Sequence, residues 1–140
     1  VSPGIYRKYL FPYLEEMGRI CREKDIPFIL HSDGNLDELL NDLYACGFKA
    51  IHPVEPDVMD IVELKRKWKG KLCLIGNVDA HVITAGTPKQ VEKKVKQLIR
   101  QVGPGGGYCI ATSGGVPHFA PIENYKALIG AAFKYGKYPL

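Results

Sequence analysis

The sequence lacks the features that mark several large classes of protein. None of its four cysteines forms a Cys-x-x-Cys pair, which favours buried free thiols in a reducing compartment. It has no signal-peptide pattern and no apolar run long enough to span a bilayer. Its lysine-rich segments match no recognised nucleic-acid motif. We therefore expect a cytoplasmic protein that binds neither membranes nor nucleic acid.

The chain is short for the architecture that its pattern suggests. Its 140 residues predict one domain covering residues 1–140, with 46% hydrophobic and 24% charged residues. A whole (β/α)₈ barrel needs roughly 200 residues or more. The first residue is Val1 and not methionine. We expect a piece of a longer or processed chain.

Much of the excess positive charge lies in two segments, Lys65–Lys69 and Lys89–Arg100, within a net charge of +4. Both segments have helical spacing, so we expect solvated helix faces. A modest positive balance also suits an anionic small-molecule substrate.

Short apolar runs alternate with helical patterns along the whole chain. The runs predicted as strands are Phe28–Leu30, Phe48–His52, Leu72–Ile75 and Tyr108–Thr112. The predicted helices cover residues 3–24, Leu36–Ala45, Val58–Trp68, Pro88 to just before Gly103, and Pro121 to about Tyr135. Such alternation predicts an α/β fold of about four parallel βα units, either half of a (β/α)₈ barrel of the TIM type or a small open sheet.

A half barrel leaves two strand edges without partners. Unpaired edges expose a row of backbone hydrogen-bonding groups. We therefore expect these edges to be covered by a missing N-terminal half of the protein or by a second copy of the chain.

Polar or glycine residues follow each predicted strand. In parallel βα folds the reactive groups lie on the loops after the strands, at the carboxyl face of the sheet. This rule selects His31, Ser32, Asp33 and Asn35 after the first strand, His52 and Glu55 after the second, Asn77 and Asp79 after the third, and Ser113, Gly114, Gly115 and His118 after the fourth. The sequence thus predicts a functional site at this face.

His31 and Asp33 are two residues apart at a strand end, so in extended geometry they point the same way. Glu55 arrives at the matching place on the next strand. These three side chains could bind a divalent metal, act as acid, base or hydrogen-bonding groups, or simply form a turn in which Asp33 caps the following helix. His52 fits a packed core histidine equally well.

We assign the polar residues after the third and fourth strands to substrate binding. A purely structural role is the alternative for some of them. Gly76–Asp79 could instead form a tight turn with a helix cap. Ser113–Gly115 lacks the G-x-S-x-G pattern of a nucleophile elbow, so we expect a loop that approaches a ligand closely. His118 lies further along the same loop. We therefore assign Asn77, Asp79, Ser113, Gly114, Gly115 and His118 to substrate contact.

Several motifs in register carry a family resemblance. They are Phe11–Leu14, Ile29–Gly34, Ile75–Asp79, Ser113–Val116 followed by Pro121, Glu123 and Asn124, and the closing Tyr135–Tyr138. Together these motifs resemble the uroporphyrinogen decarboxylase superfamily over nearly the whole chain. The resemblance implies a barrel enzyme that decarboxylates a tetrapyrrole without metal or cofactor, using an arginine pair and an aspartate from the N-terminal half. The histidine of the family's Gly-His-Gly motif falls on Gly114.

The same superfamily contains cobalamin-linked methyltransferases, which hold zinc with a His-x-Cys motif, a later cysteine and sometimes a glutamate. By this resemblance His31 matches the histidine and Glu55 fits the carboxylate position. Asp33 replaces the first cysteine, and Gly114 stands at the place of the later one.

Three hypotheses follow. The first is part of a carboxy-lyase acting on a tetrapyrrole or another anionic small molecule in porphyrin biosynthesis, with Asp33 and His31 catalytic, Asn77 near the substrate and no cofactor. The second is methyl transfer from a corrinoid, with zinc at His31, Asp33 and Glu55. The third is that the isolated chain is a non-catalytic assembling module.

Overall fold

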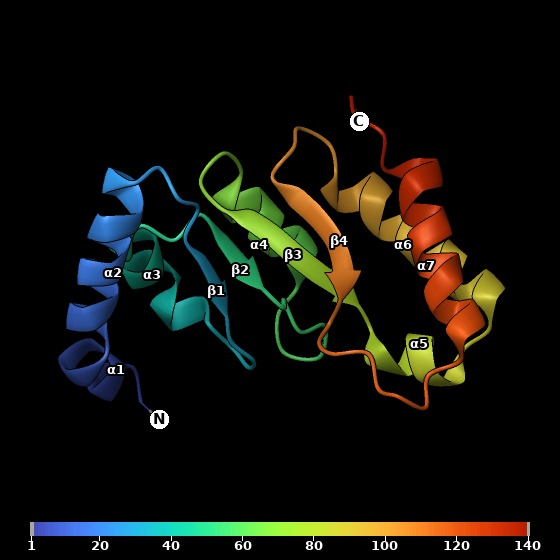
Figure 1. Cartoon of the computed structure of the whole chain (residues 1–140), viewed down its shortest axis with the longest axis horizontal. Helices are drawn as coiled ribbons and strands as arrows, with labels where there is room; N and C mark the ends of the chain where they lie inside the picture. The colour runs from blue at the N-terminus through green and yellow to red at the C-terminus, as the bar shows by residue number, and fades with distance from the viewer. Residues whose placement is uncertain (1, 140) are drawn as a thin grey trace.

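Four short strands form a parallel sheet whose spatial order follows the chain. The computed structural model describes residues 2–139 and contains the strands β1 (Ile29–His31), β2 (Ala50–His52), β3 (Cys73–Val78) and β4 (Tyr108–Thr112). The strands pair in the order β1-β2-β3-β4, all parallel (Figure 1). At least one helix separates each strand from the next, so the predicted succession of parallel βα units is confirmed.

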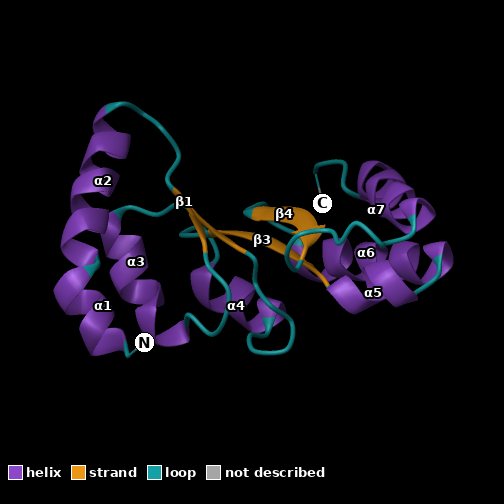
Figure 2. Cartoon of the chain, turned by 60° about the horizontal axis from the view of Figure 1, so that its bottom comes forward, coloured by secondary structure: helices purple, strands orange, loops and turns teal. Residues whose placement is uncertain are grey.

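The helices gather on one side of this sheet. They are α1 (Pro3–Tyr9), α2 (Phe11–Glu23), the 3-10 turn η1 (Asp37–Leu39), α3 (Leu40–Cys46), α4 (Ile61–Trp68), α5 (Ala80–Ala85), α6 (Pro88–Val102) and α7 (Ile122–Tyr135). Figure 2 shows the sheet nearly edge-on, with α4 against one face and the groups α1–α3 and α5–α7 at its two ends. None of the helices in the described part of the chain combines the length and apolar character that a membrane span requires.

The two faces of the sheet differ in exposure. Ile51 on β2 and Leu74 on β3 are fully buried beneath the helices. On the other face, Ile29 keeps 51% of its surface exposed, and His31 and Cys109 are also exposed. Because successive side chains of a strand point to opposite faces, this contrast defines an uncovered face, called here the open face.

The cysteines correct the expectation of buried thiols. Cys46 is buried, but Cys21 and Cys73 are only half-buried and Cys109 is exposed. The sulfur atoms of Cys73 and Cys109 lie 3.8 Å apart. Burial, together with the neighbouring Cys109, raises the pKa of Cys73 to about 11. The prediction was wrong because Cys109 belongs to the open face, which the helices do not cover.

Three predicted boundaries also change. The single helix expected over residues 3–24 breaks at Leu10, and α2 begins with Pro12 in its first turn, where a missing N–H costs nothing. The helix expected from Val58 begins at Ile61, because the Asp60 carboxylate accepts hydrogen bonds from the amides of Val62 and Glu63.

The third change concerns β3, which continues to Val78 instead of ending at Ile75. Gly76, Asn77 and Val78 pair with consecutive residues of β4, so the parallel ladder holds them in the strand. The short helix α5, which follows directly, has no counterpart in the predicted element order.

One lysine of the predicted solvated faces is buried. Lys65 is 8% exposed, and its Nζ donates a hydrogen bond to the carbonyl oxygen of Gly106. Burial lowers the pKa of Lys65, and the charge of Lys69 lowers it further. The contact fixes α4 to the loop before β4, which a helical charge pattern alone does not reveal.

Asn124 joins α7 to the end of α5. Its side chain is 1% exposed, and Nδ2 donates to the carbonyl oxygens of Ile83 (2.9 Å) and Gly86 (2.7 Å). Asn124→Ala leaves these acceptors without their partner, so we expect the free energy of unfolding of the full-length protein to fall by about 2 kcal/mol in urea denaturation. Lys126→Ala, on the exposed side of the same helix, is the control, with an expected change of about 0.5 kcal/mol or less. Equal losses in both variants would contradict this role of Asn124.

Candidate active site

Two histidine rings meet on the open face at the carboxyl ends of β1 and β2. His31 and His52 are register partners in the parallel ladder. Their Nδ1 atoms lie 2.8 Å apart, and the ring centroids are separated by 4.8 Å at an angle of 39°. This separation is that of a hydrogen bond, so one ring donates its N–H and the other accepts.

The surroundings of His52 favour its neutral form. Burial lowers the pKa of His52, and the charge of His31 lowers it further. The backbone of Thr112 and the carboxylate of Asp33 raise the pKa of His52 and partly offset these effects. The His52 ring is thus half-buried, whereas His31 is exposed.

The loops that follow β1 and β2 are joined by three contacts. The amide of Gly34 donates to Oε2 of Glu55 at 2.6 Å. Asn35 Nδ2 donates to the carbonyl oxygen of Val58 at 3.4 Å, and the amide of Leu36 contacts Sδ of Met59 at 3.4 Å. These contacts hold the two strand ends, and therefore the two histidines, in a fixed relation.

Asp33 does not cap the following helix. The 3-10 turn η1 has Leu36 at its N-cap position and no side-chain cap, and just before it the Oδ1 atom of Asn35 accepts the amide hydrogen of Asp37 at 2.9 Å. Asp33 is exposed and lines a hollow of about 540 Å³ at the end of β1. The turn-only alternative for Asp33 therefore loses its capping role, and the carboxylate faces solvent-accessible space.

A second, more enclosed hollow adjoins the first. It measures about 220 Å³, and His31 belongs to its lining. Both hollows share the residues Tyr6, Ser32, Leu36 and Leu39. Most of the second lining is apolar, contributed by Leu10, Phe11, Leu14, Leu30 and Leu43. The end of β1 therefore combines a polar mouth at Asp33 with an apolar recess at His31.

The predicted three-ligand metal site does not assemble. Within residues 2–139, no group of three or more histidine, cysteine, aspartate or glutamate side chains is arranged to hold a metal ion. His31 contacts His52 through Nδ1, and Glu55 accepts the amide of Gly34. The set of His31, Asp33 and Glu55 therefore does not fit a zinc ion, because its donors do not converge.

Two of the residues assigned to substrate contact have structural roles at the ends of β3 and β4. The Asp79 carboxylate accepts the amide hydrogen of His81 at 2.7 Å and caps α5. The hydroxyl of Ser113 accepts the amide hydrogen of Ala80 at 3.2 Å. The alternative interpretation of a turn with a helix cap is confirmed for Asp79, while its contact with a substrate stays a prediction.

The other assigned residues lie apart from the histidine pair or in open surroundings. Asn77 is 3% exposed and lines a hollow between residues 56–62 and α6. No atom within 4 Å would obstruct a side chain at Gly114 or Gly115, and His118 is exposed with its ring edge-on to Phe119. The structure thus brings together His31 and His52 and does not place Asn77 with them.

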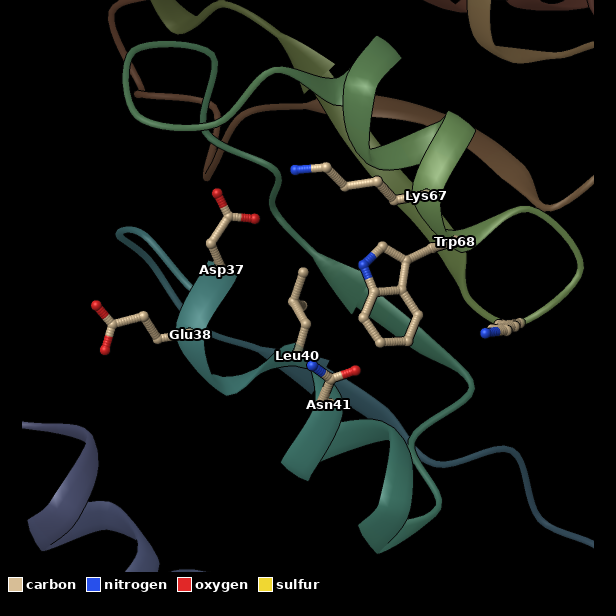
Figure 3. Close-up of a pocket in the computed structure, with 7 residues that line it drawn as sticks. Asp37, Glu38, Leu40, Asn41, Lys67 and Trp68 are labelled. Carbon is tan, nitrogen blue, oxygen red and sulfur yellow. The ribbon is translucent and has the colours of Figure 1, made fainter.

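Another hollow lies between helices and does not adjoin the histidine pair. It measures about 490 Å³ and lies between the η1–α3 segment and α4. Figure 3 shows the indole of Trp68 facing Leu40, with Asp37 and Lys67 at the rim. Its lining contains neither of the two histidines nor Asp33, so we do not assign it to the active site.

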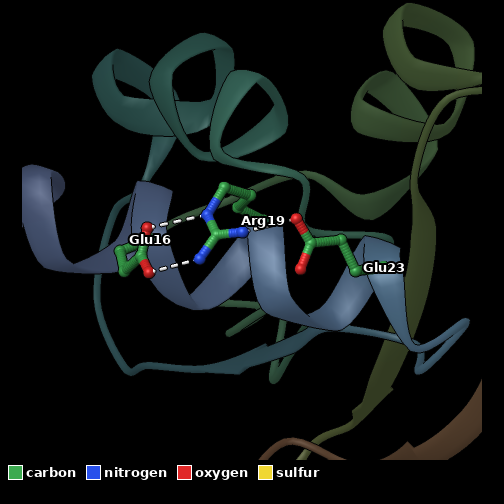
Figure 4. Close-up of polar contacts among 3 residues, drawn as sticks. All are labelled: Glu16, Arg19 and Glu23. Carbon is green, nitrogen blue, oxygen red and sulfur yellow. Dashed lines mark hydrogen bonds and ion pairs between the residues drawn. The ribbon is translucent and has the colours of Figure 1, made fainter.

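A surface cluster on α2 joins one arginine to two glutamates. Figure 4 shows Arg19 between Glu16 and Glu23, with Nε and Nη2 donating to the two oxygens of Glu16 at 2.9 and 2.6 Å. The hydrogen bond from Arg19 lowers the pKa of Glu16. Since these side chains are exposed and three or four residues apart on one helix, they support α2 and take no part in the site.

Parallel βα units with helices over one face, and with polar side chains at the carboxyl strand ends, are the architecture of a partial (β/α) barrel. The family model for uroporphyrinogen decarboxylase (URO-D) matches residues 1–135. The chain therefore belongs to the uroporphyrinogen decarboxylase family, and the resemblance found in its motifs is confirmed.

Relatives with two activities are similar to this chain. A methylcobamide:CoM methyltransferase MtaA from Methanosarcina barkeri is 27% identical over 136 residues, which cover 96% of this chain and 38% of the relative. A uroporphyrinogen decarboxylase from Actinobacillus pleuropneumoniae is 30% identical over 79 residues, which cover 56% of this chain and 22% of the relative. The family is thus shown, and the particular activity is not.

A solved structure supports the fold. A methyltransferase from Methanosarcina mazei superposes with a TM-score of 0.79 at 24% sequence identity, covering 98% of this chain and 39% of the other. The chain therefore spans about two fifths of the length of such proteins and corresponds to a partial barrel.

Sequence reasoning missed the partnership of His52. Both histidines are the last residues of neighbouring strands, and they occupy the same register position. The position of both histidines at a strand end was the only sign in the sequence that they could meet. Their contact becomes predictable only once the two strands are paired in this register.

Proposed function

We propose that the full-length protein is a carboxy-lyase that removes CO₂ from a side-chain carboxylate of a tetrapyrrole, with His31 as the proton-transferring residue. The main support for this proposal is the pair of imidazole rings on the open face, whose Nδ1 atoms lie 2.8 Å apart. His31 is exposed and adjoins the hollow at Asp33, so a substrate and solvent can both reach it. Membership of the decarboxylase family supports the same chemistry.

The proposed step needs no cofactor. Loss of CO₂ breaks a carbon–carbon bond and leaves the electron pair on the substrate carbon. Protonated His31 gives a proton to that carbon and becomes neutral, and solvent then restores the proton. In this proposal the Asp33 carboxylate, which is exposed and lines the adjoining hollow, accepts hydrogen bonds from substrate N–H groups.

The experiment is anaerobic incubation of the full-length protein with uroporphyrinogen, followed by oxidation and chromatographic detection of porphyrins. We expect conversion to products with fewer carboxylates, ending at coproporphyrinogen. A substrate pool that is unchanged at equimolar enzyme would overturn the proposal.

The alternative is methyl transfer, which is favoured by the similarity to the MtaA methyltransferase over 96% of this chain. The donor set described above does not fit the zinc that such enzymes are expected to use. Incubation with methylcobalamin and coenzyme M discriminates between the two. Demethylation of the corrinoid without any decarboxylation of uroporphyrinogen would replace our proposal by this alternative.

A further inference from the structure

We propose that His52 is a positioning residue that holds His31 with its proton on Nδ1, leaving Nε2 of His31 as the nitrogen that handles the substrate proton. The catalytic part of this inference rests on the proposed function. The tautomer of His31 is measured without any assay of activity, so the two proposals can fail separately.

The first step of the argument is the contact between the two rings. The Nδ1 atoms of His31 and His52 are 2.8 Å apart. Two neutral imidazoles can form such a hydrogen bond only if one carries its proton on Nδ1 and the other carries it on Nε2. The two tautomers are therefore coupled, and either arrangement leaves a defined atom free on His31.

The second step gives the direction of that hydrogen bond. In the proposed reaction the acid form of His31 carries a proton on both ring nitrogens, so its Nδ1–H donates to Nδ1 of His52. Once His31 has given the proton on Nε2 to the substrate, the neutral ring keeps its proton on Nδ1. His52 is the ring that stays neutral, because burial lowers its pKa.

The third step is the rigidity of the pair. The two histidines are register partners, and the loops after their strands are joined by the contact between Gly34 and Glu55 at 2.6 Å. A ring whose Nδ1–H is held by a fixed acceptor keeps both its orientation and its basicity at Nε2. His31 is exposed, so its Nε2 can exchange protons with solvent between turnovers.

The direct test is nuclear magnetic resonance of the full-length protein labelled with ¹⁵N-histidine, at about pH 8, where histidine is ordinarily neutral. Long-range proton–nitrogen correlations distinguish the two tautomers, and loss of signals in His31→Gln and His52→Gln assigns them. We expect the Nδ1–H form for His31 and the Nε2–H form for His52. An Nε2–H form of His31 in the unaltered protein would overturn the inference, whatever the protein catalyses.

The catalytic test compares two replacements of the same residue. His52→Phe has no acceptor for the Nδ1–H of His31, whereas His52→Gln keeps one in its side-chain oxygen. We expect His52→Phe to lower kcat about 10- to 100-fold with little change in KM, and His52→Gln to recover part of the loss. His81→Gln, at an exposed histidine whose contact with Asp79 is made by its backbone amide, is the matched control and should keep the activity of the unaltered protein.

Outcomes for the two proposals are separable. If uroporphyrinogen is not consumed but His31 has the Nδ1–H tautomer, the proposed function fails and the role of His52 in fixing the ring stands. If decarboxylation occurs and His52→Phe retains full kcat, the positioning role is wrong. Should His52→Phe fail to fold, the tautomer measurement on the unaltered protein still decides.

Discussion

His31→Gln is expected to lower kcat for decarboxylation by the full-length protein by about 10²- to 10⁴-fold, the usual contribution of a positioned acid–base group. Glutamine retains hydrogen-bonding capacity near His52 but cannot exchange a proton at neutral pH. Since the side chain is exposed at the end of β1, the fold should tolerate the change. The measurement is the initial rate of CO₂ release from uroporphyrinogen at saturating substrate.

His81→Gln is the matched control for this variant, because His81 is an exposed histidine whose contact with Asp79 is made by its backbone amide. It should leave kcat unchanged. A His31→Gln enzyme that works as fast as the His81→Gln enzyme would remove His31 from the mechanism.

Gly18→Ala is expected to be among the most destabilising single changes in this chain. Gly18 lies where α2 crosses the end of α3, and a Cβ atom there would stand 1.7 Å from the carbonyl oxygen of Cys46 and 2.9 Å from its carbon. The obstructing atoms are backbone, and Arg22 donates to the same carbonyl oxygen at 3.1 Å, so α2 and α3 have to separate. We expect the free energy of unfolding to fall by about 3 kcal/mol.

Gly130→Ala provides the comparison, because it makes the same chemical change at an exposed position inside α7. No atom lies within 4 Å of the added Cβ, so only the gain in helix propensity remains. We expect a stabilisation of about 0.5–1 kcal/mol. Urea denaturation of the full-length variants measures both changes, and a Gly18→Ala protein as stable as the original would show that the α2–α3 contact adapts freely.

By the resemblance described above, this chain is expected to depart from both family patterns. Asp33 would stand at a cysteine of the methyltransferase pattern, and Gly114 at a histidine of the decarboxylase pattern. The structure adds a histidine that neither pattern requires, since His52 lies against His31. An imidazole partner supplied from the neighbouring strand is a reason to look for proton transfer at His31 before metal chemistry.

Local sequence patterns were sufficient to predict much of the secondary structure. Apolar runs bounded by glycine and polar residues located all four strands, and helical spacing with Thr87 as a cap located α6, whose capping box the structure contains. The ends of helices and strands were predicted less accurately than their existence. The extension of β3 through Gly76 and Asn77 depends on pairing with β4, which a turn-like sequence conceals.

The sequence by itself determined the succession of parallel βα units, the family and the clustering of polar residues after the strands, because these depend on hydrophobic periodicity and short motifs. Only the tertiary structure decided which of those residues meet. Strand register placed His31 against His52, the loop contact engaged Glu55 with Gly34, and the helix layer covered Asn77 while leaving Cys109 exposed. The physical reason is that register and the choice of covered face arise from contacts between segments distant in the chain, which local spacing does not encode.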